Sequence, residues 1–211
     1  MKAIIVTGGK KPNRDILLKY IENDDYIIGV DSGCNCLYEY NINPNLIMGD
    51  FDSVDKKVLD FFVENNVEKI TLNVDKDYSD TQFAYEKAKD LGYKNIVMFG
   101  ASGTRIDHSL GNIGLMFDAL ANDIFLEMID DNNRVFLINK ETVLKGQYGD
   151  TLSFIPMSDK VKGVTIKGAK YLLDNYDMTL LEPRALSNEF LYDDITISFS
   201  EGIIMVIYSR D

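Results

Sequence analysis

Short apolar runs alternate with amphipathic stretches over about the first 130 residues, and this alternation most limits the folds open to the chain. A short apolar run is typical of a buried strand, whereas apolar side chains spaced three and four residues apart are typical of a helix. The predicted strands are residues 2–7, 26–30, 46–48, 68–72, 95–99 and 125–129. The predicted helices are residues 13–22, short helices around Leu37–Tyr40 and Val58–Phe62, and residues 79–91 and 107–121. This order predicts an α/β fold, with a mostly parallel sheet and helices on both faces.

The pattern changes after residue 131. Strand-like runs separated by turn residues replace the alternation, and no helical spacing of any length appears. These runs are residues 135–138, 141–144, 151–155, 161–167, 171–173, 195–199 and 203–208. They predict a small antiparallel sandwich or barrel. We therefore expect two domains, at residues 1–131 and 132–211.

The formal net charge of −12 excludes nucleic acid as an expected partner, because binding to phosphate backbones needs Lys and Arg. A nucleotide substrate stays possible, since a divalent cation can lie between carboxylates and phosphates. The longest apolar runs, such as residues 203–208, fall far short of the roughly 20 residues that cross a bilayer. The first run ends after six residues at Gly8, too early for a signal peptide. We expect a cytoplasmic protein with no membrane contact.

Four aspartate-bearing segments fall at predicted strand ends or helix starts, namely residues 31–33, 49–53, 75–81 and 103–108. The carboxyl ends of parallel strands share one edge of the sheet, where ligands bind. Carboxylates gathered at one edge repel one another unless a cation relieves the repulsion. The arrangement therefore favours a metal site over four independent surface loops.

Asp50 and Asp52 are two residues apart, so in an extended segment both carboxylates project to the same side. Such a pair can share Mg²⁺, which prefers oxygen ligands and takes one or two protein carboxylates plus phosphate oxygens. The alternative is a capping loop, in which Ser53 or Asp52 serves as the N-cap of the next helix. The segment by itself leaves both interpretations open.

The third segment repeats the pair at Asp75 and Asp77 and adds Asp80 near the start of a helix. Lys76 between them could offset their repulsion or bind a phosphate. The alternative is again helix capping, with Ser79 as the N-cap and Asp80 in the first turn, where the helix dipole favours negative charge.

The fourth segment lies between a strand and a helix. Gly100 and Gly103 leave backbone amides open to an anion, and Arg105 adds a fork of donors suited to phosphate. Asp107 could bind metal or act as a base. His108 is the single histidine, and histidine as a residue type suits acid–base work near neutral pH. A structural role at the start of the helix is the alternative for His108.

These motifs resemble those of the thiamine pyrophosphokinase family. Its members carry Gly-Asp-Phe-Asp-Ser, Asp-Lys-Asp-x-Thr/Ser-Asp and Gly-x-Arg-x-Asp-His segments, found here at residues 49–53, 75–80 and 103–108. They also carry Ser-Asn-Glu, found here at residues 187–189. The resemblance spans nearly the whole chain in the family's order. One departure is residues 182–186, where many members have small residues.

The resemblance implies an α/β nucleotide-binding catalytic domain at residues 1–131 and a thiamine-binding β-sandwich at residues 132–211. It implies a homodimer with active sites at the subunit interface. The implied reaction transfers the diphosphate of ATP to the hydroxyl of thiamine, giving thiamine diphosphate and AMP.

The resemblance and the residue chemistry together suggest a role for each motif. The expected ligands of one or two Mg²⁺ ions are Asp50, Asp52, Asp77 and Asp80. The expected catalytic residues are Asp107, Arg105, Asp77 and Lys76. The residues expected at the nucleotide are Gly8, Gly9, Asp31, Ser32, Arg105 and His108. The residues expected at thiamine are Asp80, Thr81, Ser187 and Asn188.

Three alternatives stay open at the level of sequence. The nearest is a related diphosphokinase that acts on a pterin alcohol. The second is a non-catalytic module that binds a nucleotide with Mg²⁺, and the third is a purely structural acidic protein.

Overall fold

The computed structural model describes residues 1–73, 78–103, 105–180, 182 and 184–210. The chain divides into two compact units, unit 1 at Met1–Asp131 and unit 2 at Asn132–Asp211. Each unit has a hydrophobic cluster of its own.

Unit 1 is built on a parallel sheet with the strand order β6-β5-β1-β2-β3-β4. The strands are β1 (Ala3–Val6), β2 (Tyr26–Val30), β3 (Leu46–Gly49), β4 (Glu68–Thr71), β5 (Asn95–Phe99) and β6 (Phe125–Ile129). The helices are α1 (Arg14–Tyr20), α2 (Gly33–Glu39), α3 (Lys56–Glu64), α4 (Asp80–Asp90) and α5 (Ile106–Ala121).

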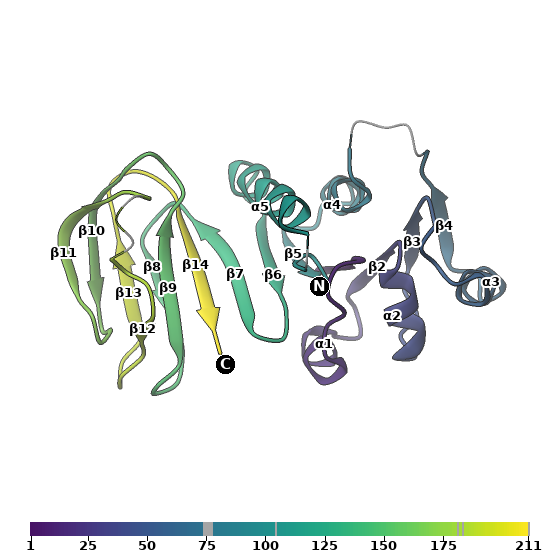
Figure 1. The fold of residues 1–211 in the computed structure, drawn as a ribbon, viewed down its shortest axis with the longest axis horizontal. Helices are drawn as coiled ribbons and strands as arrows, with labels where there is room; N and C mark the ends of the chain where they lie inside the picture. Colours follow the sequence, from purple (N-terminus) through teal and green to yellow (C-terminus); the bar gives the residue numbers. More distant parts are fainter. Residues whose placement is uncertain (74–77, 104, 181, 183, 211) are drawn as a thin grey trace. The chain divides into compact units, whose positions relative to one another are not determined.

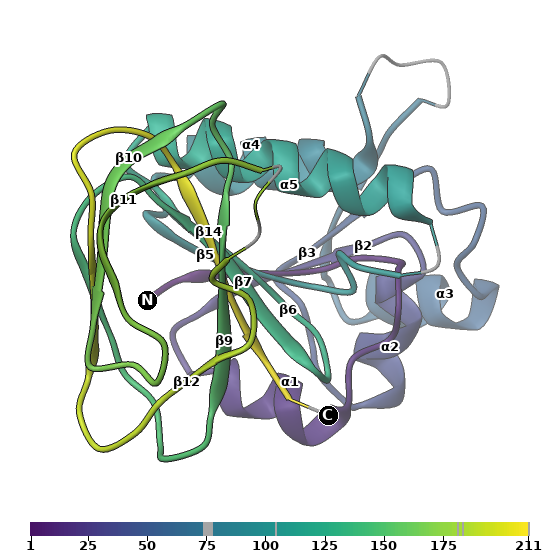
Figure 2. The same cartoon turned by 60° about the vertical axis from the view of Figure 1, so that its left-hand side comes forward.

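Helices cover both faces of this sheet. Figure 1 shows α1, α2 and α3 on one face and α4 and α5 on the other, and Figure 2 shows α4 and α5 side by side. The chain adds β2 to β4 in one direction from β1 and then β5 and β6 in the other, so right-handed crossovers place the two helix groups on opposite faces. The central strand β1 is buried at every residue, whereas the edge strand β4 is largely exposed. The predicted α/β fold is confirmed.

Unit 2 consists of two antiparallel sheets, with the orders β7-β14-β9-β12 and β8-β13-β10-β11. The strands are β7 (Asn133–Ile138), β8 (Thr142–Leu144), β9 (Thr151–Pro156), β10 (Val161–Lys167), β11 (Leu173–Met178), β12 (Asn188–Glu189), β13 (Ile195–Ser198) and β14 (Ile204–Ser209). Phe154 and Val206 of the first sheet share one buried cluster with Val164 and Ile197 of the second. This is the predicted β-sandwich.

Two strands of unit 2 differ from the sequence prediction. The strand expected at residues 171–173 is instead β11, which begins at Leu173 and includes exposed Asp174 and Asn175. An edge strand keeps polar side chains on its solvent face, and these interrupt the apolar pattern. Strand β12 was missed because two residues carry no periodic signal.

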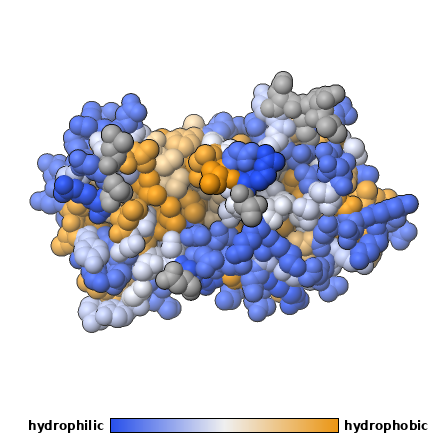
Figure 3. All heavy atoms as spheres, in the orientation of Figure 1, coloured by the Kyte–Doolittle hydropathy of each residue, from blue (hydrophilic) through white to orange (hydrophobic). Residues whose placement is uncertain are grey.

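In the described part of the chain, no helix is long and apolar enough to cross a membrane. Figure 3 shows hydrophilic residues over most of the face drawn, with hydrophobic residues gathered in patches.

Candidate active site

The loops that follow β1 and β5 lie against each other at the carboxyl edge of the unit 1 sheet. The amide of Gly9 donates to the carbonyl of Gly100 at 2.8 Å, and the amide of Lys10 donates to the carbonyl of Ser102 at 2.9 Å. A Cβ added at Gly9 would lie 2.1 Å from the Gly100 oxygen, so a larger residue fits only if backbone moves. Close packing of the two loops therefore fixes the backbone at this edge.

The loop after β2 brings Asp31 and Ser32 to the same edge. The Ser32 hydroxyl donates to the carbonyl of Gly8 at 3.4 Å. The Asp31 amide donates to the carbonyl of Met48 at 3.1 Å. The Asp31 Oδ1 atom is buried, and a Cβ added at Gly49 would lie 1.8 Å from it. The structure thus brings together the residues that were predicted for the nucleotide site after β1 and β2.

Asp50 and Asp52 follow β3 in a turn rather than in an extended segment. The Asp52 amide donates to Asp50 Oδ1 at 3.0 Å, and Phe51 between them has a φ of 62°. The expected extended geometry is therefore wrong, because an aspartate that accepts from the amide two residues on closes a local turn. The capping alternative is also wrong for Asp52 and Ser53, since the N-cap residue of α3 is Asp55.

Asn35 of α2 holds this loop in place. Its Nδ2 atom donates to the carbonyl of Ser53 at 3.2 Å, and its Oδ1 atom accepts from the amide of Asp55 at 3.0 Å. Sequence reasoning missed Asn35 because a single polar residue in a short helix gives no motif and no periodic signal.

The start of α4 lies at the same edge. Ser79 is its N-cap and accepts from the amide of Gln82 at 3.2 Å, which confirms the predicted cap. Asp80 is the first helical residue. Thr81 is buried, and its hydroxyl lies 3.0 Å from the hydroxyl of Thr7 at the end of β1. This contact fixes the start of α4 against the loop after β1.

The predicted site residues Asp75, Lys76 and Asp77 lie outside the described residues.

Arg105 and Asp107 form an exposed ion pair where the loop after β5 enters α5. Arg105 Nη2 lies 2.5 Å from Asp107 Oδ2, and Arg105 Nε donates to Oδ1 at 3.2 Å. This hydrogen-bonded guanidinium lowers the pKa of Asp107 to about 2. Asp107 and His108 both lie in the exposed first turn of α5. Asp107 is therefore ionised at neutral pH, and an incoming phosphate would compete with it for Arg105.

The described residues contain no group of three or more His, Cys, Asp or Glu side chains placed to hold a metal ion. The carboxylates of Asp50, Asp52 and Asp80 supply oxygen atoms, the ligand type that Mg²⁺ prefers. Because Mg²⁺ takes one or two protein carboxylates and completes its shell with phosphates and water, this donor set fits the ion with a substrate present.

Ser187 and Asn188 have different surroundings in unit 2. Ser187 is exposed, and its amide donates to the hydroxyl of Ser153 at 3.0 Å. Asn188 is 1% exposed, and its carboxamide bonds to the backbone of Tyr171 and Glu189. Ser187 is therefore open to a ligand, whereas the Asn188 side chain is enclosed, although the two residues are adjacent in sequence.

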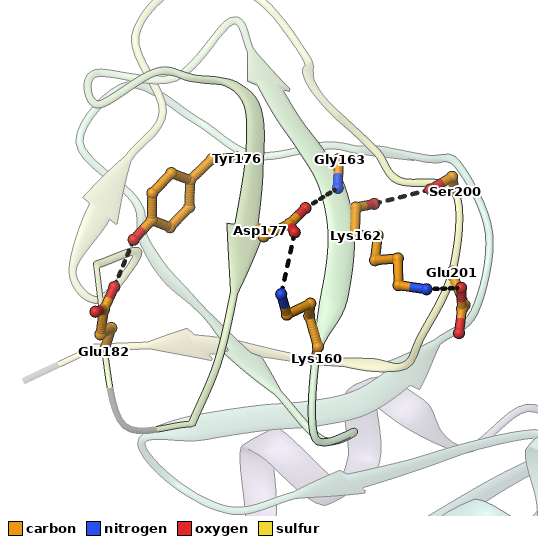
Figure 4. A network of polar contacts seen from close by, with 8 residues as sticks. All are labelled: Lys160, Lys162, Gly163, Tyr176, Asp177, Glu182, Ser200 and Glu201. Carbon is orange, nitrogen blue, oxygen red and sulfur yellow. Dashed lines mark hydrogen bonds and ion pairs between the residues drawn. The ribbon is translucent and has the colours of Figure 1, made fainter.

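The segment that departs from the family pattern is anchored at both ends. Figure 4 shows the hydroxyl of Tyr176, on β11, donating to Glu182 at 2.5 Å. The guanidinium of Arg184 lies 5.0 Å from the centre of the Tyr176 ring. Ala185 is buried, and its carbonyl accepts from the amide of Phe154 at 2.9 Å. Glu182 and Arg184 therefore have a structural role, because their side chains contact Tyr176 of β11. The Ala185 backbone binds the segment to β9.

Comparison with known proteins covers both units. A family model described as "Thiamin pyrophosphokinase, catalytic domain" matches residues 17–128. A second, described as "Thiamin pyrophosphokinase, vitamin B1 binding domain", matches residues 137–204. The thiamine pyrophosphokinase of Bacillus subtilis (strain 168) is 33% identical over 219 residues, with 100% of both chains covered.

Solved structures give the same result. The crystal structure of thiamine pyrophosphokinase from Bacillus subtilis has a TM-score of 0.92 at 31% identity and covers 100% of both chains. That of thiamin pyrophosphokinase from Geobacillus thermodenitrificans has a TM-score of 0.88 at 31% identity, covering 100% of this chain and 98% of that one. The chain therefore belongs to the thiamine pyrophosphokinase family.

Proposed function

We propose that this chain transfers the terminal diphosphate of ATP to the hydroxyl of thiamine, giving thiamine diphosphate and AMP. The observation that carries the proposal is the match of both units to the family, along the full length of a bacterial thiamine pyrophosphokinase. The gathering of aspartate-bearing loops at one edge of the unit 1 sheet supports it.

We assign the nucleotide to the edge formed by the loops after β1, β2 and β5. Gly8 and Gly9 are exposed at this edge, and Ser32, which follows Asp31, donates to the Gly8 carbonyl. Arg105 and His108 complete the set at the start of α5, where helix amides and a guanidinium favour an anion.

We assign Mg²⁺ to Asp50, Asp52, Asp77 and Asp80. When bound, the ion would neutralise phosphate charge that an acidic chain would otherwise repel. The backbone turn at Asp50 fixes where this loop leaves β3, and Asn35 fixes where it enters α3.

In the proposed reaction, the thiamine hydroxyl oxygen attacks the β-phosphorus of ATP. The bond from that phosphorus to the oxygen that bridges the α- and β-phosphates breaks, and AMP leaves with the electron pair. The hydroxyl proton passes to a base. We assign this role to Asp107. Lys76 and Arg105 are assigned to charge neutralisation at the diphosphate, and Asp77 acts through the metal ion that it would bind. While Arg105 pairs with Asp107, the pKa of Asp107 is about 2 and the carboxylate is a weak base. If the Arg105 side chain instead paired with the diphosphate, the pKa of Asp107 would rise and Asp107 would be a better proton acceptor.

We assign thiamine to Asp80 and Thr81 in unit 1 and to the segment of unit 2 that contains Ser187 and Asn188. Since the Thr81 hydroxyl lies beside that of Thr7, we infer that Thr81 orients Asp80 through the start of α4. We further propose that the protein is a cytoplasmic homodimer with active sites at the subunit interface, as the family resemblance implies.

Incubation of the purified chain with ATP, Mg²⁺ and thiamine tests this function, with the products separated by chromatography. We expect thiamine diphosphate and AMP in equal amounts. Formation of ADP would contradict diphosphate transfer. A pterin alcohol that outcompetes thiamine would favour the related diphosphokinase, and nucleotide binding without AMP release would favour a non-catalytic module.

A further inference from the structure

Asn112 binds α5 to the loop that joins β5 to this helix. It lies in the second turn of α5 and is buried, with 8% of its surface exposed. Its Nδ2 atom donates to the carbonyl of Ala101, also a buried residue, at 2.7 Å. A buried carbonyl that loses its partner costs free energy, so this bond fixes the orientation of the peptide unit that follows Ala101.

The carbonyls on either side of Ala101 are held by a different loop. The Gly100 carbonyl accepts from the amide of Gly9, and the Ser102 carbonyl accepts from the amide of Lys10. Three consecutive carbonyls of the loop after β5 therefore each accept a hydrogen bond from a different donor. Asn112 supplies the only one of these three donors that belongs to a side chain.

These bonds determine where the amides of the loop point. In a planar trans peptide unit, the carbonyl and the amide that follows it point in opposite directions. With the carbonyls of Ala101 and Ser102 bound, the amides of Ser102 and Gly103 are directed the other way. Neither amide has a hydrogen bond to another residue in the described part of the chain, and Gly103 is exposed. Consecutive amides of this kind can bind an anion.

Two cationic side chains border the same loop. Arg105 follows Gly103 by two residues, and Lys10 is the residue whose amide binds the Ser102 carbonyl. Both side chains are mostly exposed. In a chain with a formal net charge of −12, two amides beside two cations form a local setting that favours a phosphate group.

We propose that Asn112 is a positioning residue for ATP. Its bond to the Ala101 carbonyl keeps the amides of Ser102 and Gly103 directed at a phosphate group of the nucleotide, and those two amides make the contact. This inference rests on the proposed function, because it identifies backbone groups that hold phosphate at the edge assigned to the nucleotide.

Asn112→Leu tests the role of this side chain, since leucine has a similar volume but no donor. The dissociation constant for ATP with Mg²⁺, measured by calorimetry, should rise about tenfold, the order expected when a hydrogen bond to a charged group is lost. The KM for ATP should rise by a similar factor, whereas the KM for thiamine should change less than about twofold.

Asn122→Ala is the matched control. The Nδ2 atom of Asn122 also donates to a backbone carbonyl, that of Asp118, at 2.7 Å, but at the other end of α5. Its removal should leave the affinity for ATP unchanged. An equal loss of ATP affinity in the two variants would show that Asn112 only stabilises the helix.

Hydrogen exchange of the wild-type chain needs no variant and decides the outcome if Asn112→Leu does not fold. ATP with Mg²⁺ should slow exchange of the Ser102 and Gly103 amides, because a bound phosphate would occupy them. Exchange that ATP leaves unchanged would overturn the inference.

Wild-type ATP affinity in Asn112→Leu would also overturn it. Failure of the proposed function gives a different result. If the wild-type chain binds ATP but forms no thiamine diphosphate, the reaction is contradicted, and calorimetry and hydrogen exchange still test the role of Asn112.

Discussion

The two units hold their candidate site residues by different means. At the carboxyl edge of the unit 1 sheet, the loops after β1 and β5 pack together through backbone hydrogen bonds. The amides of Gly9 and Lys10 donate to the carbonyls of Gly100 and Ser102. In unit 2, the buried carboxamide of Asn188 fixes the turn that carries Tyr171. The loop packing in unit 1 therefore depends on the absence of a side chain at Gly9. The turn in unit 2 depends on the presence of the Asn188 side chain.

This difference determines which substitutions each region tolerates. Hydrogen bonds between backbone groups do not depend on the side chains that project from the loops. Substitution of the exposed aspartates of unit 1 should therefore have little effect on the fold. A methyl group added at Gly9 would meet the backbone carbonyl of Gly100 instead. In unit 2, removal of the Asn188 side chain leaves buried backbone groups without their partners, which costs free energy.

The largest expected effect is on catalysis alone. Asp52→Asn should lower turnover by 100-fold or more, on the order of the loss when one group that stabilises transition-state charge is removed. The thermal unfolding midpoint should not change, because the Asp52 side chain is exposed. Asp60→Asn, an exposed residue on α3, is the control and should retain full activity. Normal turnover in Asp52→Asn would remove Asp52 from the proposed metal site.

Gly9→Ala should have the next largest effect, on the fold as well as on activity. The new Cβ would lie 2.1 Å from the Gly100 oxygen and 2.4 Å from the Ser102 oxygen. We expect a loss of roughly 2–4 kcal/mol in the free energy of unfolding, measured with urea, because two loops must move apart. A variant as stable as the wild type would show that these loops are not closely packed.

Asn188→Ala should destabilise unit 2 by about 1–3 kcal/mol, the cost of leaving buried polar groups unsatisfied. Hydrogen exchange should show the loss as faster exchange of the Tyr171 and Glu189 amides, which Asn188 Oδ1 binds. Unchanged protection of both amides would mean that other contacts hold the turn.

Gly111→Ala should act in the opposite direction. This glycine lies within α5, and a Cβ added there has no atom within 4 Å. Alanine should stabilise the helix by roughly 0.5–1 kcal/mol, because glycine loses more backbone entropy on folding. The comparison with Gly9→Ala tests whether space, rather than glycine itself, decides the outcome. A destabilised Gly111→Ala would indicate a contact that covers this face of α5.

The smallest expected effect is the pH dependence contributed by Asp107. Its folded pKa of about 2 is below the ordinary 3.8, so its ion pair contributes stability above pH 3.8 that is lost as the pH falls toward 2. Both partners are mostly exposed, so salt should screen the contribution. Unfolding of wild type and Asp107→Asn between pH 2 and 5 should differ least at the acid end and at high salt. A difference that grows on acidification would contradict the assigned pKa direction.

The fold was predictable from sequence where periodicity is strong. Buried runs such as Ala3–Val6 and Asn95–Phe99 follow directly from the alternation of apolar and amphipathic stretches. Strand β11 was placed wrongly because its exposed Asp174 and Asn175 hide an edge strand, and β12 is too short to show a pattern.

The site was predictable as a set of loops but not as a geometry. Strand ends located Asp31 and Asp50 at one edge of the sheet. The left-handed backbone at Phe51 depends on the bond from the Asp52 amide to Asp50, which sequence spacing does not show. The contact between Asn188 and Tyr171 joins residues 17 apart, which no local motif contains.

Transfer of label from ATP carrying isotope in its β-phosphate tests the central claim most directly. Incubation with the purified chain, Mg²⁺ and thiamine should place the β label in thiamine diphosphate and leave the released AMP unlabelled. Recovery of the β label in ADP would show transfer of a single phosphate and would contradict diphosphate transfer by this chain.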